Sequence, residues 1–440
     1  MLDRLFHLSS SGTTVRTEIV AGATTFLAMA YIVFVQPTVL SAAGMDAGAV
    51  LTATCVSSAI ATLVMAFAAN YPIAVAPAMG HNFFFTYTVV VAGGTPWPVA
   101  LGAVAIAGMV FLLTAGVGLR ERVITAIPSS LKHAISVGIG LLVALVGLEW
   151  AGIVVDSPAT LVTLGSLDSR PVVLAIATLA VMAILMARGV RGAMLIAMGL
   201  STLAALGLGL TRFEGVLSAP PSLAPTLFKL DLAGALRPGM LDAVVVFFFL
   251  ALFDSIGTLV GVAGRIGLAP DGSLPRIRQA LLADASGTVI GACLGTSTVT
   301  AYIESSTGVA AGGRTGLASV VTAVLFLLAL FFHPLVRMIG GGYATGAGSV
   351  LYPSVAPALI LVGVMMMSSV GKIAWDDVTE AVPAFLAIVM MPLSFSITDG
   401  IAFGFIAYAV LKPATGRARE LSPLAYVFAA LFVLRYALLQ

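Results

Sequence analysis

Two carboxylates lie within stretches that are apolar enough to be buried in lipid. Asp254 follows a run of phenylalanines in VVVFFFLALFDSIGTLVGVAG, and Glu304 lies among hydroxyl side chains in LGTSTVTAYIESSTGVAAGG. A charged side chain at the centre of a bilayer costs roughly 2.5–3.5 kcal/mol on insertion scales. A chain keeps such groups chiefly where they face a cavity and handle a polar ligand or a proton. The two residues therefore predict a transport site.

The composition indicates the elements that must hold these carboxylates. Of the 440 residues, 60% are hydrophobic and only 9% are charged, and the mean hydropathy is +1.11. The chain breaks into apolar stretches of about 17–25 residues, the length that crosses a hydrocarbon core. We therefore expect an all-α polytopic membrane protein embedded in the lipid bilayer. The net charge of +2 gives no indication of nucleic-acid binding.

The apolar stretches fall into two sets of seven. We expect spans at about 19–43, 48–69, 72–91, 98–118, 129–149, 171–188 and 191–211, and then at about 239–264, 277–295, 297–313, 315–337, 351–371, 379–397 and 399–412. The apolar tail 421–439 is either an additional helix or the true last span, the latter if 379–412 forms a shorter hairpin.

The flanking charges predict the orientation. The short, mixed segment Met1–Gly12 does not resemble a signal peptide, which favours a cytoplasmic N-terminus in the cytoplasmic (inner) membrane. Most arginines and lysines then fall in cytoplasmic loops, as the positive-inside rule requires, including Arg120, Arg122, Arg188, Arg191, Arg314 and Lys372.

The two sets also resemble each other. The segment around Pro128 is similar to the segment around Pro353, an offset of 353 − 128 = 225, and the same offset places Glu304 opposite Met79. Because seven is odd, the two halves would insert with opposite orientations. Inverted repeats with a site at their interface are typical of alternating-access transporters.

Two spans at equivalent positions contain features that break helices. Pro72, Pro77 and Gly80 interrupt the third span, and a Thr/Ser run interrupts the tenth. Non-helical backbone at membrane depth is tolerated only where protein or water satisfies it. We expect both breaks to face a central ligand; the alternative is that they are kinks that serve packing.

Several segments together resemble the azaguanine-resistance branch of the nucleobase–cation symporter family. They are ANYPIAVAPAMGHNFFFTYTVV, ALFDSIGTLVGVAGRIGL, ADASGTVIGACLGTSTVTAYIESSTGVAAGGRTGL and MPLSFSITDGIAFGFIAYAVLK. The resemblance implies about fourteen helices in two inverted seven-helix repeats, with short antiparallel strands in spans three and ten. It also implies purine uptake (guanine, hypoxanthine or adenine) coupled to protons, often by a homodimer with an elevator-like motion.

The same resemblance divides the chain into a core and a gate domain. Spans 1–4 and 8–11 would form the core, and spans 5–7 and 12–14 the gate. The expected ranges are 1–18 for the cytoplasmic N-terminus, 19–118 and 239–337 for the core, and 119–238 and 338–440 for the gate with the C-terminal tail.

Glu304 matches the carboxylate that binds substrate in this family, and Asp254 matches a position that carries a base-binding Glu or Asp. A carboxylate can accept two N–H groups of a purine side by side. The alternatives are a helix cap for Glu304 and a bond to a neighbouring hydroxyl for Asp254. Because apolar surroundings and a second carboxylate disfavour the charged form, both residues are candidate proton carriers.

Further residues are expected to complete the substrate site. Asn82 matches a purine-recognising Asn, and its amide offers a donor and an acceptor; its alternative role is a helix cap. Phe253, or one of Phe83–Phe85, could stack on a flat base. Tyr302 and Ile303 would contribute backbone groups beside Glu304, and Gly80 and Ser305 lie at the two breaks.

Four residues are expected to support the site. His81 replaces the leucine-like residue typical of this motif and would more often cap or point into water than titrate. Asp284 matches a position that braces the core, and Thr258 stands where some branches place a His or Asp. Asp399 would be an N-cap or a gate residue that affects access.

Other classes of protein fit the sequence less well. Cys55 and Cys293 lie within spans, and the four histidines are scattered, so we expect no disulfide, metal site or cofactor. A membrane enzyme would need a nucleophile–base or metal arrangement, which is absent from the sequence. An anion transporter of the same fold would need a positive site. A uracil or xanthine permease is the nearer alternative.

Overall fold

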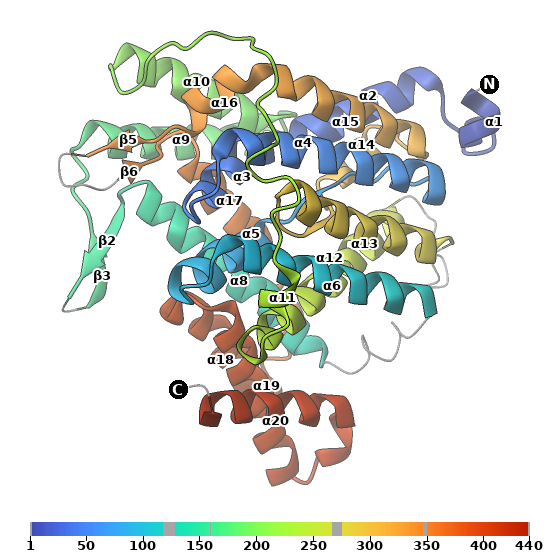
Figure 1. Ribbon diagram of the computed structural model, residues 1–440, viewed down its shortest axis with the longest axis vertical. Helices are drawn as coiled ribbons and strands as arrows, with labels where there is room; N and C mark the ends of the chain where they lie inside the picture. The colour runs from blue at the N-terminus through green and yellow to red at the C-terminus, as the bar shows by residue number, and fades with distance from the viewer. Residues whose placement is uncertain (1, 118–127, 159, 266–274, 346–349, 439–440) are drawn as a thin grey trace.

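Helices dominate the computed structural model, which describes residues 2–117, 128–158, 160–265, 275–345 and 350–438 (Figure 1). The elements of the first half are α1 (Leu2–Phe6), α2 (Val15–Met29), α3 (Ile32–Ser41), α4 (Ala47–Val64), the π-helix η1 (Met65–Ala69), β1 (Val75–Pro77), α5 (Met79–Phe83), the π-helix η2 (Phe84–Ala92), α6 (Trp97–Val117), α8 (Ser129–Trp150), β2 (Val154–Ser157), β3 (Leu161–Leu164), α9 (Arg170–Ala187), α10 (Ala193–Gly207) and α11 (Leu232–Ala235).

The second half begins after a loop that crosses one face of the molecule. Its elements are the 3₁₀ turn η3 (Pro238–Met240), α12 (Leu241–Arg265), α13 (Ile277–Leu294), β4 (Val299–Ala301), α14 (Ser305–Ala310), α15 (Gly316–Ala329), η4 (Leu330–Phe332), α16 (His333–Gly340), β5 (Tyr343–Ala344), β6 (Val350–Leu351), α17 (Ala356–Met367), η5 (Val370–Lys372), α18 (Val378–Ser394), α19 (Ile397–Ala414), η6 (Ala418–Glu420) and α20 (Pro423–Leu438).

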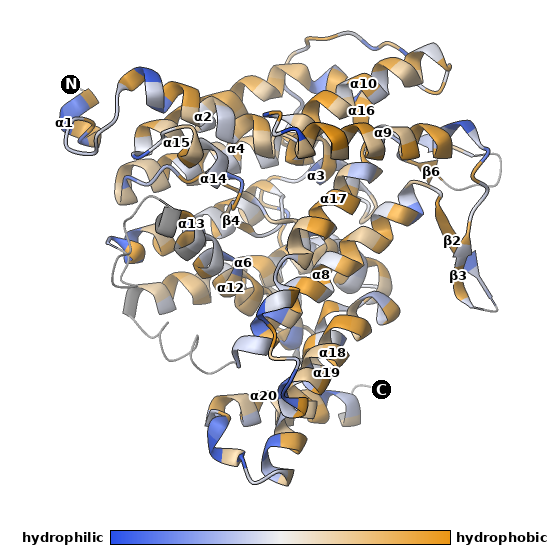
Figure 2. Cartoon of the chain, turned by 180° about the vertical axis from the view of Figure 1, so that it is seen from behind, coloured by the Kyte–Doolittle hydropathy of each residue, from blue (hydrophilic) through white to orange (hydrophobic). Residues whose placement is uncertain are grey.

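Eight of the described helical segments are long and apolar enough to cross a membrane. In Figure 2 hydrophobic residues cover the helices, and hydrophilic residues gather at helix ends and in loops. The chain is therefore a polytopic helical membrane protein, as its composition predicts.

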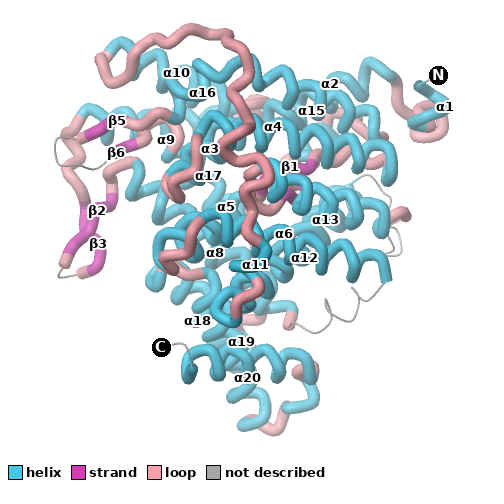
Figure 3. The backbone as a smooth tube through the Cα atoms, viewed as in Figure 1, coloured by secondary structure: helices cyan, strands magenta, loops and turns pink. Residues whose placement is uncertain are grey.

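The two broken spans pair with each other near the middle of the molecule (Figure 3). Strands β1 and β4 run antiparallel, with Val75 opposite Ala301 and Pro77 opposite Val299. This confirms the short antiparallel strands expected in spans three and ten. Two further backbone bonds extend the pairing, from Ala78 N–H to Thr298 at 3.0 Å and from Tyr302 N–H to Ala74 at 2.9 Å.

Hydroxyl groups on neighbouring helices satisfy the outer sides of these strands. Thr62 of α4 donates to the Val75 carbonyl at 3.0 Å and accepts the Val75 N–H at 2.9 Å. Thr288 of α13 donates to the Val299 carbonyl at 2.8 Å. A strand pair only three residues long can exist among helices where protein groups such as these hydroxyls bond to its outer donors and acceptors.

The helices pack in two groups. One contains α2, α4, α6 and α12–α15, in which α15 packs on α2 and α4, and α13 packs on α4 and α6. The other contains α8, α9, α10 and α17–α19, in which α8 packs on both α17 and α18. Strands β1 and β4 and the short helices α5 and α14 belong to the first group, and α5 also contacts α8.

The structure refines several predicted boundaries. The first span begins at Val15 and is interrupted at Ala30–Tyr31, between α2 and α3. Residues 378–394 and 397–414 form two separate helices, and the tail forms a further helix, α20. Arg120, Arg122 and the predicted boundary at 118/119 lie outside the described residues.

Close packing of the first group predicts that glycine is required where α2 meets α15. A Cβ at Gly22 would lie 2.3 Å from the Ala318 carbonyl oxygen and 2.7 Å from Val321 Cβ, so the helices must separate. Overpacking of this kind costs about 1–3 kcal/mol. We expect Gly22→Ala to lower the apparent melting temperature of the detergent-purified protein.

Gly199→Ala is the matched control, because a Cβ at Gly199 in α10 meets nothing within 4 Å. Equal melting temperatures for the two variants would contradict the close helix contact.

Candidate functional site

Glu304 lies where the chain leaves β4 and begins α14. It occupies the N-cap position of α14, but its side chain makes no capping hydrogen bond to that helix. Instead its Oε1 accepts a hydrogen bond of 2.8 Å from the hydroxyl of Tyr31. Glu304 is half-buried, whereas Tyr31 is almost completely buried. The carboxylate is therefore held from one side and remains accessible from another.

Asp254 lies in the middle of α12, and half of its side-chain surface is accessible. Its Oδ2 lies 3.7 Å from Nδ1 of His81 in α5, too far for a hydrogen bond. The expectation that His81 caps a helix or points into water is wrong, because the side chain is buried and faces Asp254. Asp254 lies halfway along a helix of 25 residues. An accessible carboxylate at that depth needs a polar environment inside the membrane protein.

Asn82 lies inside α5 and braces the two breaks against each other. The Ser297 hydroxyl donates to its Oδ1, and Gln36 of α3 donates to the Thr296 hydroxyl at 2.9 Å. Asn82, Gln36 and Ser297 are fully buried. Asn82 is thus not a helix cap, and its amide oxygen is already engaged by protein.

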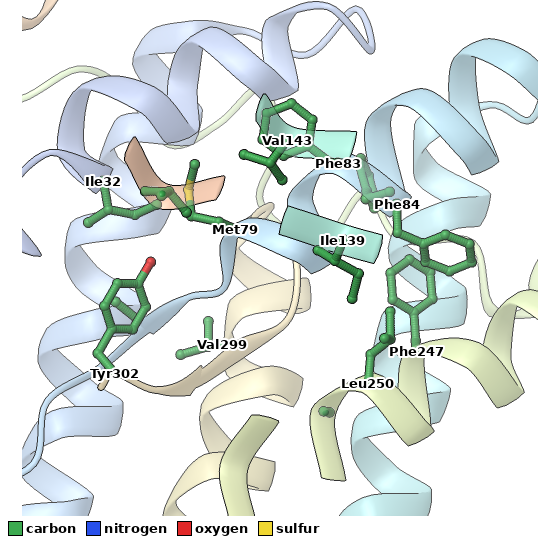
Figure 4. Packing of buried hydrophobic residues seen from close by; sticks show 14 of the residues in the cluster. Ile32, Met79, Phe83, Phe84, Ile139, Val143, Phe247, Leu250, Val299 and Tyr302 are labelled. Carbon is green, nitrogen blue, oxygen red and sulfur yellow. The ribbon is translucent and has the colours of Figure 1, made fainter. Parts of the chain in front are cut away.

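Gly80 permits a close contact between the two helix groups. A Cβ at this position would lie 2.7 Å from Cγ2 of Ile139 in α8. Figure 4 shows Ile139 among side chains of the α5–η2 segment and of α12. The structure therefore gives Gly80 a packing role at the boundary between the groups.

The residues around Glu304 mostly hold the break together. The Ser305 hydroxyl accepts the Ala74 N–H at 3.0 Å, and the Tyr302 hydroxyl donates to the Pro77 carbonyl. The N–H of Tyr302 donates to the Ala74 carbonyl, and the Tyr302 carbonyl accepts the Ser305 N–H, so the Tyr302 N–H is not free for a ligand. The Ile303 side chain is exposed, and its backbone carbonyl accepts the Ser306 N–H.

Phe253 directly precedes Asp254 on α12. It is only partly buried and stacks on Phe249 with ring centroids 5.9 Å apart. On the side of the second helix group, Nζ of Lys132 lies 5.9 Å from the Phe253 ring centroid. Phe83, Phe84 and Phe85 are instead buried, and Phe84 packs edge-on against Phe247 (Figure 4).

An apolar cavity of about 20 Å³ adjoins Phe253 between α8, α12, α19 and α20. That volume holds about one water molecule, so the cavity is too small for a heterocycle. Its lining residues include Ile135, Leu250, Ile401, Phe428 and Phe432.

The supporting residues occupy different positions. Asp284 of α13 is completely buried and makes no hydrogen bond of ordinary geometry, although the Ser255 hydroxyl and the Ala301 backbone are its polar neighbours. Ala301 belongs to β4, so Asp284 lies beside one broken span, and its hydrogen bonds to the broken spans stay a prediction. Thr258 is buried one turn beyond Asp254 on α12.

Asp399 lies away from the breaks and is not the N-cap of α19, a position taken by Ser396. Its carboxylate accepts from Arg435 at 2.9 Å and from the Tyr436 hydroxyl at 2.7 Å, both on α20. Nε of Arg435 also lies 2.8 Å from Asp242 at the start of α12. One arginine therefore joins the two helix groups through α20.

Sequence reasoning missed Tyr31, Gln36 and Ser297. The signal in the sequence is the pair of polar side chains in AMAYIVFVQP, with Gln36 directly before Pro37 in an otherwise apolar span. A buried amide in a membrane helix needs a partner, and both hydroxyls that Gln36 contacts come from the Thr/Ser run before β4.

Two carboxylates and the ends of two broken helices can bind a polar ligand through hydrogen bonds. Both carboxylates accept and neither donates while charged, so the site favours a ligand rich in N–H groups or one that carries a proton. Among the described residues, no group of three His, Cys, Asp or Glu side chains could hold a metal ion.

Comparisons with known proteins agree with this arrangement. A family model described as a permease family matches residues 16–403. The chain is 47% identical to the adenine permease AdeP of Escherichia coli, over 99% of this chain and 96% of that one. It is 44% identical to the guanine/hypoxanthine permease PbuG of Bacillus subtilis, over 99% of each.

A solved structure has the same fold. The transmembrane domain of a cyanobacterial bicarbonate transporter, BicA, superposes with a TM-score of 0.63 at 17% identity, covering 87% of this chain and 97% of that one. The family match confirms the resemblance seen in the sequence: the chain belongs to the nucleobase permease family and is a membrane transport protein, not an enzyme.

Proposed function

We propose that this protein imports purine nucleobases together with protons across the cytoplasmic membrane. The observation that carries the proposal is Glu304, a half-buried carboxylate held by Tyr31 where two broken spans meet. Relatives that align over nearly the whole chain are named as adenine and guanine/hypoxanthine permeases, which supports a purine as the ligand. Guanine and hypoxanthine both present ring N–H groups that a carboxylate can accept.

The two carboxylates then have different roles. Glu304 accepts the N–H edge of the base, and Phe253 provides an apolar ring for its flat face. Asp254 has no hydrogen bond to protein among the described residues and is accessible, so it can gain and lose a proton during the cycle. Asn82 acts on the base indirectly, by fixing the break between β1 and α5 through Ser297.

The two helix groups correspond to a core and a gate domain. The first group holds Asp254 and Glu304, and the second meets it at Gly80 and Ile139. The eight long helices, together with α10, α13, α17, α18 and the two broken segments, make fourteen spans. The offset between Met79 and Ser305, where α5 and α14 begin, is 305 − 79 = 226, close to the 225 of the sequence repeat, which supports two inverted repeats.

Transport would follow from movement of the core against the gate. Elevator-like motion requires contacts between the domains that can break and form again. The ion pairs of Arg435 with Asp242 and Asp399 are such contacts, since partly exposed pairs contribute little net stability. The charge distribution supports a cytoplasmic N-terminus, and the family resemblance supports a homodimer.

An anion as the substrate is disfavoured by the same geometry. The fold is shared with a bicarbonate transporter, but fold alone does not identify a substrate. Two accessible or half-buried carboxylates, Asp254 and Glu304, would repel an anion at the site.

Substitution of Glu304 tests the binding role. We expect Glu304→Gln to raise the KM for guanine, hypoxanthine or adenine about 10–100-fold, because the lost hydrogen bonds involve a charged group. Uptake of labelled base into proteoliposomes measures this. Glu214→Gln is the control, since Glu214 forms an exposed surface pair with Arg337. An unchanged KM for Glu304→Gln would remove Glu304 from the site.

Substitution of Asp254 tests the coupling to protons. We expect Asp254→Asn to bind a purine yet fail to accumulate it when a pH gradient is imposed, because the amide cannot carry a proton. The measurement is uptake into proteoliposomes with and without a protonophore. Asp156→Asn on the exposed β2–β3 hairpin should remain sensitive to the protonophore. Gradient-driven accumulation by Asp254→Asn would refute its role as the proton carrier.

A further inference from the structure

Tyr31 occupies the interruption of the first span, directly before α3 begins at Ile32. It is 2% exposed, although it lies next to the half-buried Glu304. Its hydroxyl donates to Glu304 Oε1 at 2.8 Å, across 273 residues of sequence. Because so little of Tyr31 is accessible, any influence it has on a ligand must act through Glu304.

Among the described residues, this is the one hydrogen bond of ordinary geometry that another side chain gives to the Glu304 carboxylate. The last torsion of a free glutamate is broad, so an unrestrained carboxylate turns easily. A hydrogen bond to a charged oxygen is roughly twice as strong as one between neutral groups. Tyr31 therefore fixes the plane of the carboxylate and leaves Oε2 for another donor.

A second tyrosine supports the first. Tyr302 lies beside the Tyr31 side chain, and its own hydroxyl donates to the Pro77 carbonyl at the end of β1. Tyr302 thus anchors the chain two residues before Glu304 to the backbone of the opposite broken span. Tyr31 holds the carboxylate from the first span, so the orientation of the carboxylate does not depend on α14 alone.

We propose that Tyr31 is a positioning residue for purine recognition, a proposal that rests on the proposed function of Glu304. It holds the carboxylate so that the acceptor edge already faces the N–H groups of the base before the base arrives. A preorganised acceptor binds more tightly because it loses less conformational freedom on binding. The specificity for a base with an N–H edge then belongs to the pair Tyr31–Glu304.

The test is Tyr31→Phe in the full-length protein, which removes the hydroxyl and keeps the buried ring. We expect the KM for guanine, hypoxanthine or adenine to rise about 10-fold, with the maximal rate within about 3-fold of the parent protein. Tyr408→Phe is the matched control. Tyr408 is also buried and also donates to a carboxylate, that of Glu380, but it lies in the other helix group. The KM of the Tyr408→Phe variant should therefore equal that of the parent protein.

A double-mutant cycle separates this proposal from the proposed function. In a Glu304→Ala background, Tyr31→Phe should change KM less than 2-fold, because the group that the Tyr31 hydroxyl orients is gone. If Glu304→Gln alone has no effect, the proposed binding role fails. If Glu304→Gln raises KM but Tyr31→Phe does not, or if the two effects are independent, the positioning role of Tyr31 is overturned. Binding of the unlabelled base to purified protein by calorimetry provides the second readout if uptake is low.

Discussion

The structure depends on the pairing of β1 with β4 inside the membrane domain. A bilayer offers no water to satisfy free backbone groups, so a break in a spanning helix is tolerated only if protein supplies partners. Here each break supplies partners for the other, and Thr62 and Thr288 bond to the outer sides of Val75 and Val299. The pairing brings together residues that are more than two hundred positions apart. It places Glu304 at the end of one strand and the start of α5 at the end of the other, with Asp254 on the adjacent helix.

The sequence predicted the parts of this arrangement that depend on local chemistry. Proline and a Thr/Ser run cannot continue a lipid-facing helix, and carboxylates in apolar spans need a polar environment, so the breaks, Asp254 and Glu304 could all be identified. The family resemblance supplied the antiparallel pairing of the strands. What a single sequence could not show is which distant side chain completes each bond. Nothing near Tyr31 indicates a partner 273 residues away, and His81 resembled a helix cap until its burial beside Asp254 was seen.

The same limitation explains the residues whose roles differ from expectation. Asn82 has the donor and acceptor that a purine edge requires, but its amide oxygen accepts a hydrogen bond from the Ser297 hydroxyl. Asp399 was one of several acids near helix starts, and only the fold of the C-terminal tail back onto α12 and α19 gives it Arg435. In each case tertiary contacts decided between two chemically reasonable alternatives.

The central claim is that the N–H edge of a purine is bound by Glu304 between the two broken spans. The most direct measurement is an experimental structure of the protein in lipid with guanine bound. We predict density for the base beside β1, β4 and α12, with its N–H groups within hydrogen-bonding distance of the Glu304 carboxylate and Tyr31 still bound to that carboxylate. A base bound elsewhere, or held with Glu304 turned away from it, would contradict the claim.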